Sequence, residues 1–362
     1  MHFFRLIFLL FIFMPSFASA ITLKEKIGQM LILGFHGTVI NDQSEITKII
    51  QNYNIGGVII FENNIETPQQ LTKLNEDLQK INHKINRFFN RPELPLFISI
   101  DYEGGKVNRL KEIYGFPKTF SAKEIGQMSI ANATTEAIKM RKTLNHTGFN
   151  LNFAPALDLE VNSNNPIIAK KERSFSAEPI AVSTYAGIFS KEYLSHNIIC
   201  SYKHFPGHGS STGDSHIEFV DVTETWHEDE LLPYLYQFNL PFHCDMIMTS
   251  HIVNKKLDDT GMPATMSHKM LTDILRHKLK FNGVIITDDM QMKAIADHYS
   301  KKEAITKAIN AGVDMLIFAN QLDTQDPQEI IDLIFTQVQK GKISQDRIED
   351  AYQHIVNLKR SI

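Results

Sequence analysis

Short apolar runs return eight times along this chain, and segments with helical spacing separate most of them. The runs are continuous rather than alternating, which is typical of strands buried on both faces of a parallel sheet. They occupy residues 30–35, 56–61, 96–100, 151–159, 198–200, 245–249, 284–286 and 315–319. Eight such strands alternating with helices predict an α/β protein with a single (β/α)8 barrel of the TIM type. A doubly wound sheet is the alternative.

The segments between the runs carry helix signals. Thr22 with Glu25, and Ser121 with Glu124, have the spacing of capping boxes, and the second is expected to open a helix that ends near residue 144. Ser267 resembles the cap of a helix with an apolar face. Amphipathic spacing predicts further helices over residues 67–85, 179–195, 328–339 and 345–358. Because no linker, repeat or low-complexity segment interrupts this series, we expect one catalytic domain over residues 21–362.

Residues 1–20 read as a secretory signal peptide rather than as part of the fold. Arg5 precedes an apolar run over residues 6–14, and Ala18-Ser19-Ala20 has the small-x-small pattern of a cleavage site. The run is short for a membrane span, although an uncleaved anchor is the alternative. No cysteine follows the cleavage site, which argues against a lipoprotein anchor. We therefore expect an exported protein, periplasmic or secreted, with no stable membrane partner.

Charge and cysteine content narrow the other possibilities. Lys plus Arg number 37 and Asp plus Glu 41, so no basic excess suggests a nucleic-acid partner. Cys200 and Cys244 each lie in or beside an apolar run, which favours buried thiols. Two cysteines in an oxidising compartment nevertheless leave a disulfide open.

The polar loop over residues 198–216, IICSYKHFPGHGSSTGDSH, is the strongest sign of a site. Lys203 and His204 stand where a buried strand would end, and a run of proline and glycine follows them. Asp214 and His216, two residues apart, can carry a proton. A lone histidine is more often a structural group than a catalyst, but structural needs rarely call for so many polar groups together.

Other polar residues follow the predicted strands in the same way. Barrel enzymes place their sites at the carboxyl ends of strands. A single aspartate there is often only a cap or turn residue, so the agreement among strands carries the argument. The residues at these ends are Asp101, Asp158, Lys203, His204, His251 and Asp288.

Three kinds of protein could use such a rim of polar residues at the carboxyl ends of the strands. A metal-dependent hydrolase would draw on His204, His208, His216, His251 and Asp288, but the usual pair of metal histidines on the first strand is missing. A non-catalytic binding barrel would hold a polar ligand through Lys203, Arg109 and Arg173. The third is a retaining glycosidase, in which a carboxylate attacks the anomeric carbon and a second group transfers the proton.

Several segments together resemble the β-N-acetylhexosaminidases of glycoside hydrolase family 3. They are IDYEGGKVNRL at residues 100–110, NFAPALDL at 152–159, ERSFS at 172–176, KHFPGHG at 203–209, DSH at 214–216 and ITDDM at 286–290. Their order is also the family's order. The resemblance implies a one-domain (β/α)8 barrel that removes terminal N-acetylglucosamine, often from peptidoglycan fragments. It implies neither a metal nor an organic cofactor, and a small glycan as substrate; we expect a monomer.

The resemblance also implies a role for each matching residue. Asp288 is then the nucleophile, with Asp289 as a supporting neighbour, while His216 is the acid/base and Asp214 its dyad partner. The charge of Asp214 would hold the imidazole and favour its protonated form. His208 would shape the loop. The positions implied for sugar binding are Asp101, Arg109, Arg173, Lys203 and His204.

Three positions depart from the family's usual residues. Tyr102 and Lys106 replace glutamine and arginine, and Ser176 replaces glycine. We expect Tyr102 to narrow the sugar site or to change the preferred sugar. Export is a further departure, because members that recycle wall fragments are usually cytoplasmic, so chitin oligosaccharides are a second substrate class. Phosphorolysis is an alternative reaction, because a histidine in place of a carboxylate does not repel an incoming phosphate.

Overall fold

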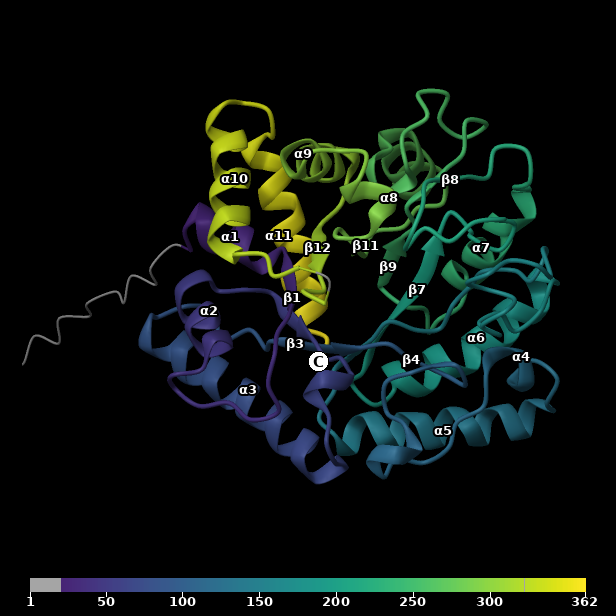
Figure 1. Ribbon diagram of the computed structural model, residues 1–362, viewed down its shortest axis with the longest axis horizontal. Helices are drawn as coiled ribbons and strands as arrows, with labels where there is room; N and C mark the ends of the chain where they lie inside the picture. Colours follow the sequence, from purple (N-terminus) through teal and green to yellow (C-terminus); the bar gives the residue numbers. More distant parts are fainter. Residues whose placement is uncertain (1–20, 322) are drawn as a thin grey trace, which may run out of the picture.

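Eight parallel strands close into a barrel at the centre of the molecule, which confirms the predicted fold class (Figure 1). The computed structural model describes residues 21–321 and 323–362, so the predicted signal peptide lies outside the described residues. The strands follow one another around the barrel in chain order, and the first pairs with both the second and the last. They are β1 (Leu31–Gly34), β2 (Gly57–Ile59), β3 (Phe97–Ile100), β6 (Leu151–Asn152), β7 (Ile199–Phe205), β9 (Met246–Thr249), β11 (Val284–Asp289) and β12 (Met315–Phe318).

Helices surround the barrel, as Figure 1 shows. The longer ones are α1 (Leu23–Gln29), α2 (Glu45–Tyr53), α3 (Pro68–Phe88), α5 (Ile130–His146), α6 (Pro179–Leu194), α7 (Leu232–Phe238), the π-helical η5 (Lys269–Lys278), α9 (Lys301–Ala311), α10 (Pro327–Gln339) and α11 (Gln345–Lys359). Thr22 and Glu25 form the predicted capping box at the start of α1. Helix α9, capped by Ser300, has no counterpart among the predicted helices.

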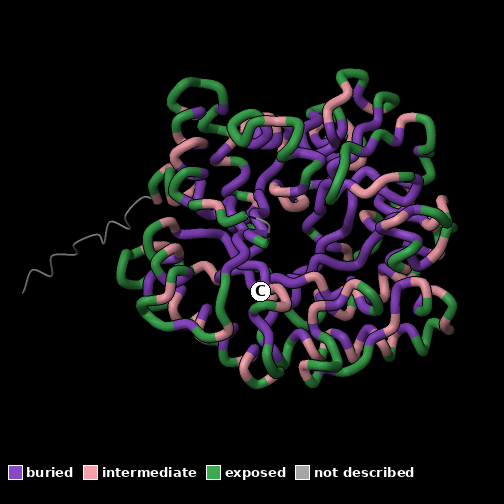
Figure 2. The backbone as a smooth tube through the Cα atoms, viewed as in Figure 1, coloured by how far each residue is buried: buried purple, intermediate pink, exposed green. Residues whose placement is uncertain are grey.

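The core lies in and around the barrel wall. Every residue of β1, β2, β3, β9 and β12 is buried, and Figure 2 shows burial concentrated around the strands with exposed backbone at the periphery. Strands buried on both faces explain why their sequences are continuously apolar. Across residues 21–321 and 323–362, no helix is both long and apolar enough to cross a membrane.

Two short sheets extend from the barrel at the ends of its strands. The first is a hairpin of β4 (Tyr102–Gly104) and β5 (Val107–Asn108) directly after β3. The second pairs β8 (Val220–Asp221) with β10 (Ile252–Val253), which follow β7 and β9 respectively. A small apolar cluster of Val220, Val222, Trp226 and Ile252 packs around this second sheet. Both sheets therefore frame the end of the barrel where the predicted site lies.

The fourth strand is shorter than the run of residues 151–159 suggests. Strand β6 ends at Asn152, and the chain then continues beside β7 with a single bridge between Ala156 and Lys203. Pro155 lies within the run, and a proline has no N–H to give to a ladder of hydrogen bonds. The prediction of a nine-residue strand was therefore wrong, although the segment still leads to the rim.

The helix expected from Ser121 to residue 144 is in fact two helices. Helix α4 (Ala122–Ile125) has the predicted capping box but ends at Gly126, and Ser129 caps α5 as a new start. A Cβ atom at position 126 would lie 1.9 Å from the carbonyl oxygen of Phe175. The chain therefore passes so close to its neighbour here that only glycine fits, and this contact is not visible in the local sequence pattern.

Cys200 and Cys244 form a disulfide, so the expectation of two buried thiols was wrong. Cys200 lies in β7, and Cys244 lies just before β9, the next strand around the barrel. Their Cα atoms are 5.1 Å apart, which is within the usual range for a disulfide. Burial in an apolar run was a correct observation, but it did not distinguish a buried thiol from a buried disulfide.

Candidate active site

The structure gathers the predicted polar residues at the carboxyl ends of the strands. Asp101 follows β3 directly, Lys203 and His204 are the two residues before the last residue of β7, and Asp288 lies in the last part of β11. His251 follows β9, and Asp158 comes from the extended segment after β6. Because all eight strands are parallel, these ends meet at one rim.

A chain of alternating charges crosses this rim. The Lys203 ammonium donates to Asp101 at 2.7 Å and lies 2.6 Å from a carboxylate oxygen of Glu103. Glu103 in turn accepts two hydrogen bonds from the Arg173 guanidinium, at 2.8 and 2.7 Å. Lys203 and Arg173 are 2% and 7% exposed, so both cations depend on protein partners rather than on water.

The charge chain continues from Arg173 to His204 and Asp158. The Arg173 guanidinium lies 3.0 Å from Nε2 of His204, and Nδ1 of His204 lies 2.6 Å from an Asp158 oxygen. A guanidinium can only donate, so Nε2 accepts and the proton of a neutral ring stands on Nδ1, facing Asp158. Burial would raise the pKa of Asp158, but His204 and the N–H of His208 outweigh it and lower the pKa.

Glu103 is the rim residue that the sequence analysis did not single out. Burial alone would raise the pKa of its carboxyl, but Arg173 and Lys203 hold that pKa well below its ordinary value. It lies two residues after Asp101, and alternate residues of an extended chain share one face. That spacing was the available signal for finding it.

Arg109 and Asp101 form the more open end of the charge chain. A guanidinium nitrogen of Arg109 lies 3.6 Å from Asp101, and the two side chains are 30% and 19% exposed. Their remaining hydrogen-bonding capacity can therefore face a ligand. Lys203 and Arg173, by contrast, are largely engaged with carboxylates of the protein.

Tyr102 does not reach the sugar-binding positions, which corrects the expectation that it narrows that site. Its side chain is fully buried, and its hydroxyl lies near Thr143 and Glu136 of helix α5. Burial raises the pKa of Tyr102 to about 12. Lys106 points outward and pairs with Glu172 at 2.6 Å.

Two adjacent aspartates at the end of β11 have opposite properties. Burial would raise the pKa of Asp288, but the imidazoles of His204, His251 and His216 lower it to about 2. Burial raises the pKa of Asp289 to about 6, although its carboxylate accepts the N–H groups of Ala319 and Gln291. Asp288 is therefore ionised at neutral pH and faces histidines, whereas Asp289 ties β11 to the chain after β12.

The loop after β7 carries Asp214 and His216 as a hydrogen-bonded pair. Nδ1 of His216 lies 2.7 Å from Asp214, whose carboxylate also accepts the His216 N–H at 2.9 Å. The His216 side chain is 50% exposed, which leaves Nε2 available to a ligand. His208 is instead buried inside the loop, between the hydroxyls of Ser211 and Ser215.

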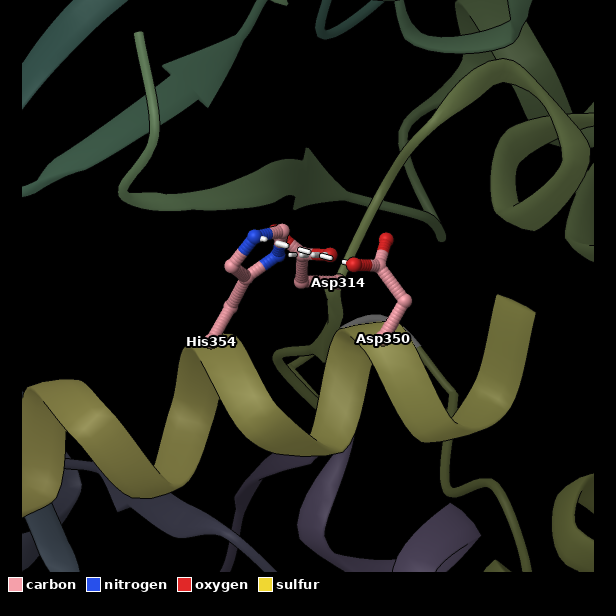
Figure 3. A group of neighbouring side chains, drawn as sticks. All are labelled: Asp314, Asp350 and His354. Carbon is pink, nitrogen blue, oxygen red and sulfur yellow. Dashed lines mark hydrogen bonds and ion pairs between the residues drawn. The ribbon is translucent and has the colours of Figure 1, made fainter. Parts of the chain in front are cut away.

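A group that could hold a metal ion lies at the opposite end of the barrel. Among the described residues, the ligand atoms of Asp314, Asp350 and His354 converge to within 4.8 Å (Figure 3). Asp314 directly precedes β12, and Arg276 and Arg347 already pair with its carboxylate. The arginines occupy the sides that a cation would need, so the cluster is best described as a buried ion-pair network.

Comparison with known proteins identifies close relatives of this arrangement. Residues 22–358 match the model of the glycosyl hydrolase family 3 N terminal domain. Beta-hexosaminidase A of Pseudoalteromonas piscicida is 30% identical, with 94% of this chain aligned to 62% of that protein. The beta-hexosaminidase of Tolumonas auensis is 33% identical, with 76% of this chain aligned to 79% of that protein.

Solved structures show the same architecture. A glycoside hydrolase family 3 beta-N-acetylglucosaminidase from Paenibacillus sp. FPU-7 is 30% identical and superposes with a TM-score of 0.84. The alignment covers 94% of this chain and 63% of that one, so the chain spans less than two thirds of the length of both this structure and the Pseudoalteromonas relative. A beta-N-acetylhexosaminidase from Beutenbergia cavernae shares the fold over 99% of its length, at 23% identity and a TM-score of 0.83.

Glu103→Gln should destabilise the protein strongly, because it leaves the buried cations Lys203 and Arg173 without their shared carboxylate. Breaking a buried ion pair typically costs about 3–5 kcal/mol. We expect a loss of this size in the free energy of unfolding by urea at pH 7, and less than about 0.5 kcal/mol for the exposed control Glu93→Gln.

The stability difference between wild type and Glu103→Gln should depend on pH in one direction. The pKa of Glu103 is lower in the folded than in the unfolded chain, so its stabilisation is present above about pH 4.3 and declines as the pH falls further. The gap between wild type and Glu103→Gln should therefore narrow below that pH. A loss under about 1 kcal/mol at pH 7 would contradict this account of the charge chain.

Proposed function

Because this chain belongs to glycosyl hydrolase family 3, we propose that it is a retaining β-N-acetylhexosaminidase. Its substrates would be peptidoglycan fragments or chitin oligosaccharides with a terminal β-linked N-acetylglucosamine. The observation that carries the proposal is an ionised Asp288 at the end of β11 that is close enough to His216, of the Asp214–His216 pair on the loop after β7, for the imidazole to lower its pKa. The names of the relatives point in the same direction.

The proposed reaction begins with attack by the Asp288 carboxylate on the anomeric carbon. The bond to the leaving oxygen breaks, its electron pair stays with that oxygen, and His216 supplies a proton from Nε2. The product of this step is a covalent glycosyl-enzyme. An Asp288 pKa of about 2 keeps the nucleophile ionised over the physiological range.

The second step reverses the roles of the same groups. Neutral His216 removes a proton from water, whose oxygen attacks the anomeric carbon and frees the Asp288 carboxylate. Two inversions at one carbon return the β configuration. Asp214, with its pKa lowered by its hydrogen bonds to His216 despite opposing burial, stays negative and stabilises the imidazolium of each cycle.

The sugar-binding role is divided between exposed and buried groups. Asp101 and Arg109 have free donors and acceptors for sugar hydroxyls, because they form the open end of the charge chain. Lys203, Arg173 and His204 would hold the sugar less directly, since protein carboxylates already occupy most of their hydrogen bonds. This division predicts that truncating Arg109 affects substrate affinity more than protein stability.

Phosphorolysis is the second candidate reaction. The proposed acid/base is a half-exposed imidazole rather than a carboxylate, so an incoming phosphate would not meet a like charge at that position. In that reaction phosphate replaces water in the second step and the product is a sugar phosphate. Product analysis in the presence of phosphate separates the two reactions.

Release of nitrophenol tests the proposed activity. We expect turnover of 4-nitrophenyl β-N-acetylglucosaminide, little turnover of the β-glucoside, and no change on adding EDTA or phosphate. Activation by phosphate with a sugar phosphate as product would establish the phosphorylase instead. No turnover of either sugar by folded protein would favour a binding barrel, and inhibition by EDTA would favour the metal hydrolase.

Variants at the two proposed catalytic residues should fail in different ways. Asp288→Ala should abolish turnover, because no covalent intermediate can form. His216→Ala should spare the first step for substrates with good leaving groups but slow the second by about 10²–10⁴-fold, with added azide restoring the rate. His277→Ala, on the exposed face of η5, is a matched control. Wild-type rates of both steps in His216→Ala would refute the acid/base assignment.

We also propose that the protein is exported before it acts. The pattern of residues 1–20 supports export, and so does the disulfide between Cys200 and Cys244, because structural disulfides persist in oxidising compartments. After osmotic shock we expect the protein in the released fraction, with an N-terminus near residue 21. Full-length protein in the cytosol, with both thiols open to alkylation under denaturing conditions, would contradict the proposal.

A further inference from the structure

A buried carboxyl outside the barrel strands reaches the loop that carries His216. Glu230 lies in the short helix η3 (Glu228–Leu231), and it is 1% exposed although its neighbours Glu228 and Asp229 face solvent. Its Oε2 atom accepts the backbone N–H of Gly209 at 2.9 Å. A buried acid therefore holds the loop five residues before Asp214.

The loop packs against this carboxyl without spare room. Gly207 has φ +116°, and a Cβ atom there would lie 2.6 Å from Cβ of Glu230 and 2.9 Å from its Oε2. The indole N–H of Trp226, four residues before Glu230, donates to the carbonyl oxygen of Pro206 at 3.2 Å. The segment from Trp226 to Glu230 thus fixes the first part of the loop from one side.

Asn165 holds the same part of the loop from the other side. Its buried side-chain amide donates to the carbonyl oxygens of His208 at 2.7 Å and Gly209 at 3.0 Å. Gly209 is therefore bound on its N–H by Glu230 and on its carbonyl by Asn165. Two buried side chains therefore restrain the backbone of Gly209.

The half-exposed His216 side chain is held by Asp214, and the backbone of both residues continues from the part of the loop that Glu230 and Asn165 hold. We propose that Glu230 is a positioning residue for the acid/base, which acts by fixing the backbone of Gly209 and hence the path of the loop to Asp214 and His216. The proposal rests on the acid/base role of His216 proposed above. It assigns Glu230 no contact with the substrate.

The charges around Glu230 favour its neutral form. The Asp158 carboxylate approaches from the segment after β6, and the uncharged phenol of Tyr234 approaches from α7. Burial raises the pKa of Glu230 to about 7; the Ser210 hydroxyl opposes this and the charge of Asp158 adds to it. Glutamine is therefore a close substitute below pH 7, because it is neutral and can still accept the Gly209 N–H.

The test compares Glu230→Gln and Glu230→Ala on two substrates at pH 6. Dinitrophenolate leaves from a dinitrophenyl N-acetylglucosaminide without help from an acid. The sugar that leaves from N,N′-diacetylchitobiose needs a proton from His216. The ratio kcat/KM reports only the first step, up to formation of the glycosyl-enzyme. We expect Glu230→Ala to lose about 10–100-fold in kcat/KM on the disaccharide, because a shift near 1 Å can cost about that much, with a far smaller loss in kcat/KM on the dinitrophenyl substrate. Glu230→Gln and the exposed control Glu228→Gln should stay within about 3-fold of wild type.

Equal losses in kcat/KM on the two substrates in Glu230→Ala would overturn the proposal, since they indicate a general structural defect. So would a Glu230→Gln variant as impaired as Glu230→Ala. If Glu230→Ala does not fold, Glu230→Asp withdraws the acceptor by one methylene and is read in the same way.

Hydrogen exchange separates failure of this inference from failure of the proposed activity. If the wild type turns over neither substrate, the proposed activity fails. The hold on the loop is then measured by exchange of peptides covering residues 207–219. Faster exchange in Glu230→Ala but not in Glu230→Gln supports the positioning role, and unchanged exchange in both refutes it.

Discussion

The alternating charges from Asp101 to Asp158 are the constraint on which the rest of the rim depends. Lys203 and Arg173 are almost wholly buried, and a buried cation is stable only beside an opposite charge with well-aligned hydrogen bonds. Glu103 supplies that charge to both, and Arg173 continues the chain to His204. Because each member satisfies two neighbours, the network fixes β3, β7 and the segment after β6 relative to one another.

The surroundings of Asp288 and Asp289 show how the same rim sets chemical roles. The two residues have the same side chain and are adjacent, yet the pKa of Asp288 falls to about 2 and that of Asp289 rises to about 6. Both are partly buried, so burial does not distinguish them. The two pKa values differ because the neighbours differ. Asp288 lies near three imidazoles, whereas Asp289 accepts two backbone N–H groups, one of them from the residue after β12. An ionised carboxylate among histidines is suited to attack an anomeric carbon.

The sequence predicted those features that depend on local pattern. Continuous apolar runs identified all eight strands, and polar residues at their ends identified most of the rim. Features that depend on contacts between distant segments were missed. The sequence around Tyr102 does not reveal that its ring turns toward α5. Nor does the sequence around Cys200 reveal that Cys244, just before the next strand, lies 5.1 Å away between Cα atoms. Only glycine fits at position 126, where α4 ends, because the backbone of Phe175 passes beside it.

The two proposed catalytic groups differ in how they are held. Asp288 lies near the end of a barrel strand, and the residues just before it pair with β9, so the sheet holds the backbone that leads to the proposed nucleophile. His216 must both give and take a proton at a group that changes from a leaving sugar to water, and it lies on a half-exposed loop. Such a loop can admit the leaving group, but no sheet hydrogen bonds fix the backbone at His216. Buried contacts at Pro206, Gly207 and Gly209 supply that restraint at the start of the loop, before the backbone reaches solvent.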